Sequence, residues 1–161
     1  MTLARKEQIH AELVSIVAAD LGVVERAHRA TREAATHEEA KPENDKDTRA
    51  LEQSYLARGQ AMRIEELRAG LASLERMRLV ELGEGAVAAL GALVELSADG
   101  GDTTTVFVAP YGGGSKLATG DVQVVTPQSP LGRALLGKLE GDECEVILGG
   151  RTRQLAIVRV A

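Results

Sequence analysis

Three carboxylates lie close together in a short segment of the N-terminal half of the chain. Glu43, Asp45 and Asp47 fall within five residues. Carboxylate oxygens are preferred ligands of hard cations such as Mg²⁺. Asp residues in the first turn of a helix also cap its end and complement its dipole. The cluster therefore has two interpretations, a cation site or a helix start at Asp45 and Asp47 beside a solvated Glu43.

The segments on both sides of these acids have the period of long helices. Between about Thr2 and Glu39 there is no proline, and a row of positions recurs three or four residues apart. That row is Ile9, Leu13, Val17, Leu21, Val24, His28 and Ala35. Pro42 disfavours helical geometry at the preceding residue, so the first helix is expected to end there.

A second helix is predicted from about Asp47 to Val80. Its apolar row is Ile64, Leu67, Leu71 and Leu74, and we expect it to continue less regularly through Leu51, Tyr55 and Met62. Two long helices with matching rows and a short connection form an antiparallel coiled coil. Residues 1–80 are therefore predicted to be a helical hairpin with an acidic tip near residues 41–47.

The pattern of residues changes from helical to β-rich after Leu82, and residues 83–161 are predicted to form a small separate domain. Short β-rich runs alternate there with glycine-containing turns. The runs are Ala92–Ser97, Thr103–Ala109, Val122–Thr126, Cys144–Leu148 and Gln154–Val160. One helix is expected over Ser129–Lys138, capped by Ser129 with Pro130 in its first position. The fold class is α+β, a helical hairpin followed by an antiparallel sheet with one helix.

Composition restricts the partners and the kinds of site. The net charge of -5 argues against free duplex DNA. The single cysteine excludes an internal disulfide and fits a reducing cytoplasm, and no run is apolar enough for a membrane span. Residues Gly112–Lys116 lack the Gly-Lys-(Ser/Thr) order of a phosphate-binding loop and are interpreted as a hairpin turn. No nucleophile and base are paired, so we do not expect an enzyme that acts alone.

One segment of the C-terminal half resembles a known signature. Residues 126–146 read TPQSPLGRALLGKLEGDECEV, with a Ser-Pro-apolar-small-Arg run, a Gly-Lys pair and a Gly-Asp turn before a strand. This run is similar to the C-terminal signature of the Gre factors, bacterial proteins that stimulate transcript cleavage. The layout of a coiled-coil hairpin and an FKBP-like domain without isomerase activity resembles the same family over nearly the whole chain.

The resemblance implies a function inside another enzyme. Gre factors bind RNA polymerase, insert the hairpin through its secondary channel and stimulate cleavage of backtracked RNA by the polymerase. By this resemblance, Asp47, Asp45 and Glu43 would help to bind a second Mg²⁺, which is present only in the complex. Arg49, Arg58 and Arg32 would contact the RNA 3′ end, and Ser129, Pro130 and Leu131 would contact the polymerase rim. The alternative for the arginines is a solvated charged face, and for Ser129 simple helix capping.

The tip departs from the usual pattern of the family, an Asp and a Glu separated by Leu-Lys. With Lys46 aligned, this chain has Asn44 and Asp47 at the two acidic positions. Either Glu43 or Asp45 supplies the missing carboxylate, or the protein is a non-cleaving channel binder that inhibits or modulates transcription. A coiled-coil adaptor unrelated to polymerase is a third interpretation, and it leaves the signature unexplained.

Overall fold

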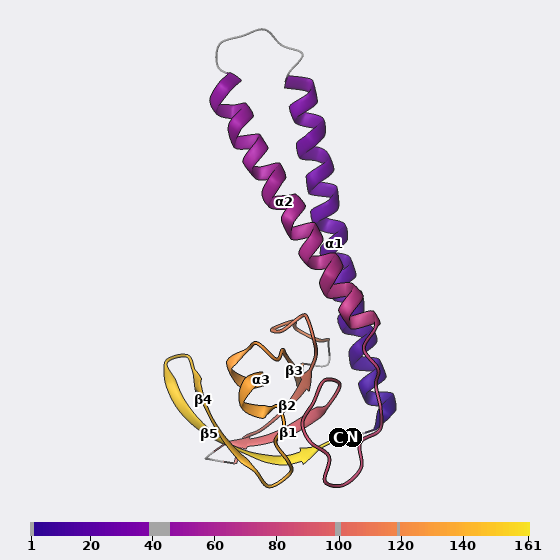
Figure 1. Ribbon diagram of the computed structural model, residues 1–161, viewed down its shortest axis with the longest axis vertical. Coiled ribbons are helices and arrows are strands. Elements are labelled where there is room, and N and C mark those ends of the chain that lie inside the picture. The colour runs from indigo at the N-terminus through magenta and orange to yellow at the C-terminus, as the bar shows by residue number, and fades with distance from the viewer. Residues whose placement is uncertain (1, 39–45, 99–100, 119) are drawn as a thin grey trace. The chain divides into compact units, whose positions relative to one another are not determined.

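The computed structural model describes residues 2–38, 46–98, 101–118 and 120–161. Two long helices, α1 (Leu3–Glu38) and α2 (Lys46–Glu75), precede a five-stranded sheet and a short helix, which confirms the predicted fold class (Figure 1). Two compact units divide the chain. One comprises Met1–Ser15 and Ala72–Ala161, and the other comprises Ile16–Leu71. The first turns of α1 thus belong to the same compact unit as the sheet.

In the unit Ile16–Leu71, α1 and α2 run antiparallel (Figure 1). We call the row of side chains between the two helices the seam. Val17, Ile64 and Leu67 are buried in it, and Leu21, Val24 and His28 are partly buried. The seam predicted for α1 is therefore confirmed. Its apolar contacts hold the two helices together, because most of the stability of helices in proteins comes from packing of this kind.

The seam of α2 takes a different course from the predicted one beyond Ile64. Leu51, Tyr55 and Met62 are 54%, 65% and 66% exposed, so their predicted place in the seam is wrong. Spacings of four and three continue instead through the partly buried Gln60, Ala57 and Gln53. At 3.6 residues per turn, these two rows lie on opposite sides of the helix. Helical period decides the seam here, although the residues in register are polar or small.

The second unit contains a sheet of strand order β3-β2-β1-β5-β4. Its strands are β1 (Leu93–Ala98), β2 (Thr103–Val108), β3 (Val122–Val125), β4 (Glu143–Leu148) and β5 (Arg151–Val160). The pairs are antiparallel except β2 and β3, which are parallel. Parallel neighbours need a crossover, so residues 112–116 lie in a long connection and not in the predicted hairpin turn. Lys116 instead forms an antiparallel bridge with Gln123.

Helix α3 (Pro130–Leu135) packs on one face of this sheet and closes the hydrophobic core. Leu131 and Leu135 are buried among strand residues such as Val94, Val106 and Ile157. Successive strand residues point to opposite faces. The neighbouring residues Leu93, Phe107 and Val124, which are aligned across three strands, are therefore buried on the other face. Both faces of this part of the sheet are thus covered.

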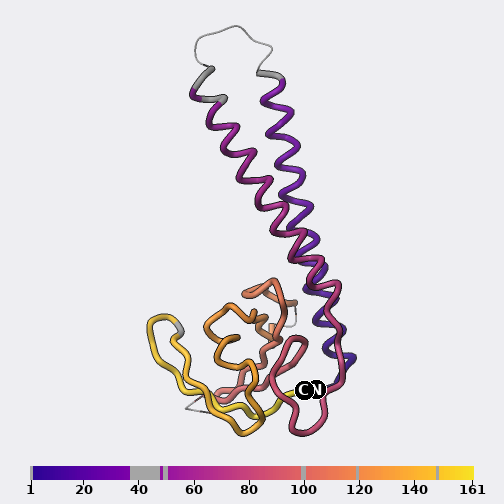
Figure 2. Tube along the Cα trace, in the orientation of Figure 1, coloured from indigo at the N-terminus to yellow at the C-terminus, as the bar shows by residue number. Residues whose placement is uncertain are grey.

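The start of α1, residues 3–15, is fastened to this unit by polar contacts, and we call it the helix base. The Nζ atom of Lys6, a residue only 1% exposed, donates to the carbonyl of Val80 (2.8 Å). His10 donates from Nε2 to the carbonyl of Leu74 (2.8 Å) near the end of α2. Figure 2 shows how the trace brings the start of α1 beside the end of β5, where Leu3 and Val160 line one cavity.

Two further contacts tie the helix base to the connection between β2 and β3. The guanidinium of Arg5 donates to both carboxylate oxygens of Asp121 (3.0 and 2.9 Å), and Glu12 accepts from the backbone N–H of Ala118. None of the helices, over the residues the structure describes, is long and apolar enough to cross a membrane.

Candidate functional site

Of the three predicted metal ligands, only Asp47 belongs to a described helix. Glu43 and Asp45 fall outside the described residues. Asp47 is the second residue of α2, and Arg49 follows in the same turn, with both side chains outside the description. Within the described ranges, no group of three His, Cys, Asp or Glu side chains could hold a metal ion. The proposed role of the three acids stays a prediction.

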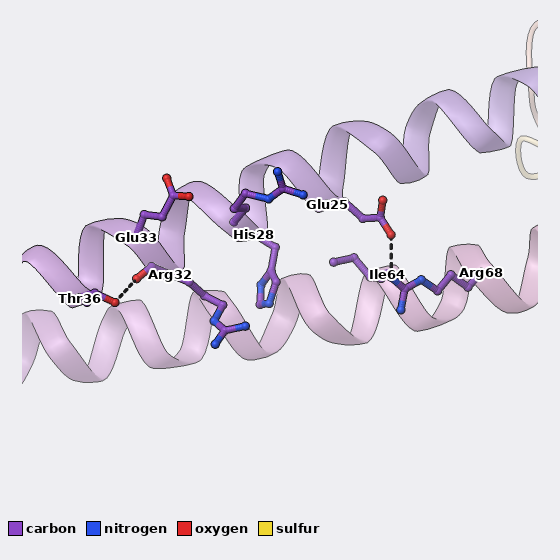
Figure 3. A pocket seen from close by; sticks show the side chains of 8 residues that line it. Glu25, His28, Arg32, Glu33, Thr36, Ile64 and Arg68 are labelled. Carbon is purple, nitrogen blue, oxygen red and sulfur yellow. Dashed lines mark hydrogen bonds and ion pairs between the residues drawn. The ribbon is translucent and has the colours of Figure 1, made fainter.

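A groove lies on the hairpin in the part of α1 that leads towards this connection, and we call it the arginine groove. Its volume is about 510 Å³. Its lining residues are Glu25, His28, Arg29, Arg32, Glu33, Thr36, Ile64 and Arg68. Six of them come from α1, where spacings of three, four and seven residues place them along one side of the helix. Figure 3 shows His28 and Arg32 extending from α1 towards α2.

The arginines of the groove differ in how they are neutralised. Arg68 donates to Glu25 across the helices (2.7 Å) and to Glu65 on its own helix (3.1 Å). The hydrogen bond to Glu25 is the main reason why the pKa of Arg68 is raised, so this cation stays charged. The guanidiniums of Arg29 and Arg32 have no partner among the described residues. Each can therefore take an external anion, and a guanidinium suits a phosphate.

Two buried polar atoms lie in this part of the hairpin, where a coiled coil is normally apolar, and one of them belongs to His28, which lines the groove. The Nδ1 atom of His28 and the Oε1 atom of Gln60 are buried without a hydrogen-bond partner in the described part of the chain. Each such atom costs on the order of 1–3 kcal/mol. The packing of α1 on α2 is therefore less favourable around His28 and Gln60 than at Leu67 and Leu74, which are apolar and buried.

The structure divides the three arginines predicted to contact RNA. Arg32 lies in the arginine groove, together with Arg29 and Arg68, which the sequence analysis did not select. Arg58 is exposed on α2 and is not part of the groove lining. The seven-residue spacing between Glu25 and Arg32 was a signal that could have revealed this face of α1, because residues seven apart share a helix face.

The residues predicted to contact the polymerase rim have different degrees of access. Pro130 is exposed, but Leu131 is 5% exposed and belongs to the core, so its side chain offers little surface. The hydroxyl of Ser129 caps α3 by accepting from the backbone N–H of Gly132 (3.0 Å) and donates to the carbonyl of Thr126 (2.8 Å). A Cβ at Gly132 would meet that carbonyl oxygen at 1.9 Å. Much of the signature is thus explained by local packing.

Comparison with known proteins gives a consistent family. Residues 84–161 match the family described as "Transcription elongation factor, GreA/GreB, C-term". Transcription elongation factor GreA of Methylococcus capsulatus is 31% identical over 135 residues, which are 84% of this chain and 81% of that protein.

Among solved structures, the fold is similar to that of GreA factor homolog 1 (Gfh1) of Thermus thermophilus, with 21% identity, 92% of this chain and 94% of that chain covered, and a TM-score of 0.42. Thermus aquaticus Gfh1 is similar at 21% identity over 91% of this chain and 92% of that chain, with a TM-score of 0.42. The extent and identity of the match to the Methylococcus protein, together with the C-terminal family match, show that the chain belongs to the GreA/GreB family of transcription elongation factors.

Proposed function

We propose that this protein binds RNA polymerase, inserts its hairpin into the secondary channel and stimulates cleavage of backtracked RNA by the polymerase itself. The observation that carries this proposal is the arrangement along the hairpin. Asp47 is the second residue of α2 and is close in sequence to Glu43 and Asp45. Arg29 and Arg32, which have no partner among the described residues, lie on α1, the helix that precedes these acids in the chain. This order along the chain supports a hairpin on which carboxylates near the tip would bind a metal ion and arginines on α1 would bind phosphate.

In this proposal, the acidic residues would bind the metal ion and the arginines would bind the RNA. Asp47, with Asp45 or Glu43, would hold a second Mg²⁺ in the complex, which when bound stabilises the charge that develops on the phosphodiester. Arg29 and Arg32 would attract backbone phosphates of the extruded RNA, because contacts to phosphate position a strand without reading its sequence. Exposed Pro130 would belong to the contact with the polymerase rim.

A second function remains open because of one residue. Asn44 stands where the family pattern has an acid, and an amide is a weaker ligand for a hard cation than a carboxylate. With too few carboxylates, the same hairpin would occupy the channel and modulate transcription without cleavage. The two functions share the same partner and differ in the chemistry at the tip.

A stalled, backtracked elongation complex distinguishes the two functions. We expect the unmodified protein to shorten the RNA in the presence of Mg²⁺, and Asp47→Asn to abolish this while it still binds polymerase. Amide and carboxylate have similar size and similar helix propensity, so folding should be preserved. Asp20→Asn, at an exposed acid of α1, is the matched control and should cleave normally.

The remaining outcomes assign the function. Tight binding to polymerase without cleavage by the unmodified protein would support the modulating function. Loss of both binding and cleavage in Asp47→Asn would mean that the acid acts only as a helix cap. Cleavage of naked RNA by the purified protein, without polymerase, would overturn the proposal that the chemistry belongs to the polymerase.

A further inference from the structure

The side of α2 opposite the seam carries apolar residues that the described part of the hairpin leaves exposed. Leu51, Tyr55 and Met62 are each more than half exposed. Their spacings of four and seven residues place them on one face of the helix, and we call this row the outer stripe. Arg58 lies between Tyr55 and Met62 on the same face and is also exposed.

The seam cannot explain why these residues are apolar. The positions that face α1 at the same height are Gln53, Ala57 and Gln60, so the larger apolar side chains point outward and the polar ones inward. This arrangement lowers the stability of the hairpin by itself, because exposed apolar surface gains nothing from folding. A row of exposed large apolar residues on an otherwise polar helix is typical of a surface that another molecule covers.

We infer that the outer stripe docks against an apolar protein surface that carries a carboxylate, and that this surface is part of RNA polymerase. Tyr, Met and Arg are enriched at protein interfaces. The guanidinium of Arg58 has no partner among the described residues, whereas Arg63 and Arg68 form ion pairs with Glu66 and Glu65. A cation left unpaired within an apolar row calls for an anion on the partner. The inference rests on the proposed function, because it names the face of the hairpin that meets the polymerase.

The size of the outer stripe argues against a second copy of the chain as its occupant. A stable interface needs about 800 Å² from each partner, which three side chains do not supply. Leu51 and Met62 are eleven residues apart, a length of roughly 16 Å along the helix. Such a stripe is effective only where other contacts already hold the hairpin in place, as they would inside a channel.

RNA is the competing occupant, because bases stack on tyrosine and arginine binds phosphate. Two features favour protein. Arg29 and Arg32 are two arginines on one helix, whereas Arg58 is a single arginine in its row. The other residues of the outer stripe include the aliphatic Leu51 and the thioether of Met62. Contact with RNA would also depend strongly on salt, whereas an apolar contact would not.

The test is the affinity for core RNA polymerase without nucleic acid. We expect the double variant Tyr55→Ser/Met62→Ser to bind about tenfold or more weakly, as is usual when interface anchors are removed. Arg58→Glu should also weaken binding. Val23→Ser is the matched control, an exposed apolar residue of α1 that is 57% accessible, and its affinity should be unchanged. Circular dichroism and thermal melting should be similar for all variants, since the altered side chains are exposed.

Equal affinity of the double variant and the unmodified protein would overturn the inference. A loss that occurs only when an extruded RNA is present, and that disappears at high salt, would assign the outer stripe to RNA and overturn it as well. An equal loss in Val23→Ser would overturn the assignment to this face. If the unmodified protein itself failed to bind polymerase, the proposed function would fail, which is a different result from a failure of the outer stripe alone.

Discussion

The guanidinium of Arg68 on α2 lies 2.7 Å from the carboxylate of Glu25 on α1. This ion pair joins the two helices at one end of the arginine groove. The two side chains are 55% and 38% exposed, so water screens the pair and it contributes little to stability. Its effect on the groove is larger than its effect on folding, because it neutralises one of three arginines and leaves the other two available.

We therefore expect Arg32→Gln and Arg68→Gln to differ in function. Arg32 has no partner among the described residues, so its loss should reduce RNA cleavage in a backtracked complex several-fold and reduce the dependence on salt. Arg68 is already paired with Glu25 and Glu65, so its loss should have a smaller effect. Cleavage assays at two salt concentrations measure both. A larger effect of Arg68→Gln would contradict the assignment of the free cations.

Pro130→Glu should weaken binding to polymerase without unfolding the protein. Pro130 is exposed at the first position of α3, where a carboxylate is favoured by the helix dipole. A change in affinity is therefore attributable to the surface. The measurement is the affinity for core polymerase together with a thermal melt. Glu140→Gln, at an exposed residue that follows α3 in the chain, serves as a control. Unchanged affinity would remove Pro130 from the polymerase contact.

Two glycine substitutions should change stability in opposite directions. Gly132→Ala places a methyl group against the carbonyl of Thr126, and we expect a loss of about 2 kcal/mol or more. Gly59 lies within α2 with open space around it, so Gly59→Ala should stabilise the helix by about 0.5–1 kcal/mol. Urea unfolding measures both. A harmless Gly132→Ala would mean that the signature glycine is not needed for packing.

Lys6 should make stability depend on pH in the alkaline range. Burial lowers its pKa, and the nearby Glu81 opposes this in part. As pH rises towards the unfolded value of about 10.4, the folded state loses this proton first, so the free energy of unfolding rises in that window. Relative to Lys6→Met, the unmodified protein should gain stability as the pH rises through the alkaline range towards about 10.4. Parallel pH profiles for the two proteins would contradict this.

The sequence predicted the elements well because period and turn chemistry are local. The row from Ile9 to His28 and the cap at Ser129 depend only on neighbouring residues, and both are confirmed. The parallel pairing of β2 with β3 was not predicted, because it depends on how residues 109–121 cross over. The error in the seam had another cause. The prediction chose Leu51 and Tyr55 because they are large and apolar, although helical spacing from Ile64 leads to Ala57 and Gln53.

The candidate site was only partly predictable. Arg32 was selected for its place near the tip, but its grouping with Arg29 and Arg68 depends on the register between two helices, which a single sequence does not specify. The burial of Leu131 follows from the packing of α3 on the sheet, so its apolar character reflects the core. The signature identified the family correctly and still mixed residues that are exposed with residues that hold the fold together.

The helix base has a consequence for how the chain is built. Ile9 and Leu13 complete a unit whose other residues begin at Ala72, so segment 16–71 is topologically an insertion into that unit. In a growing polypeptide, the residues that these two apolar side chains contact in the folded unit are synthesised much later. Contacts between residues so far apart in the sequence are slow to form. The same topology makes the inserted segment exchangeable. Whole helical turns can be added or removed between Ile16 and Leu71 without cutting the sheet, so hairpins of different reach can arise on one unchanged unit.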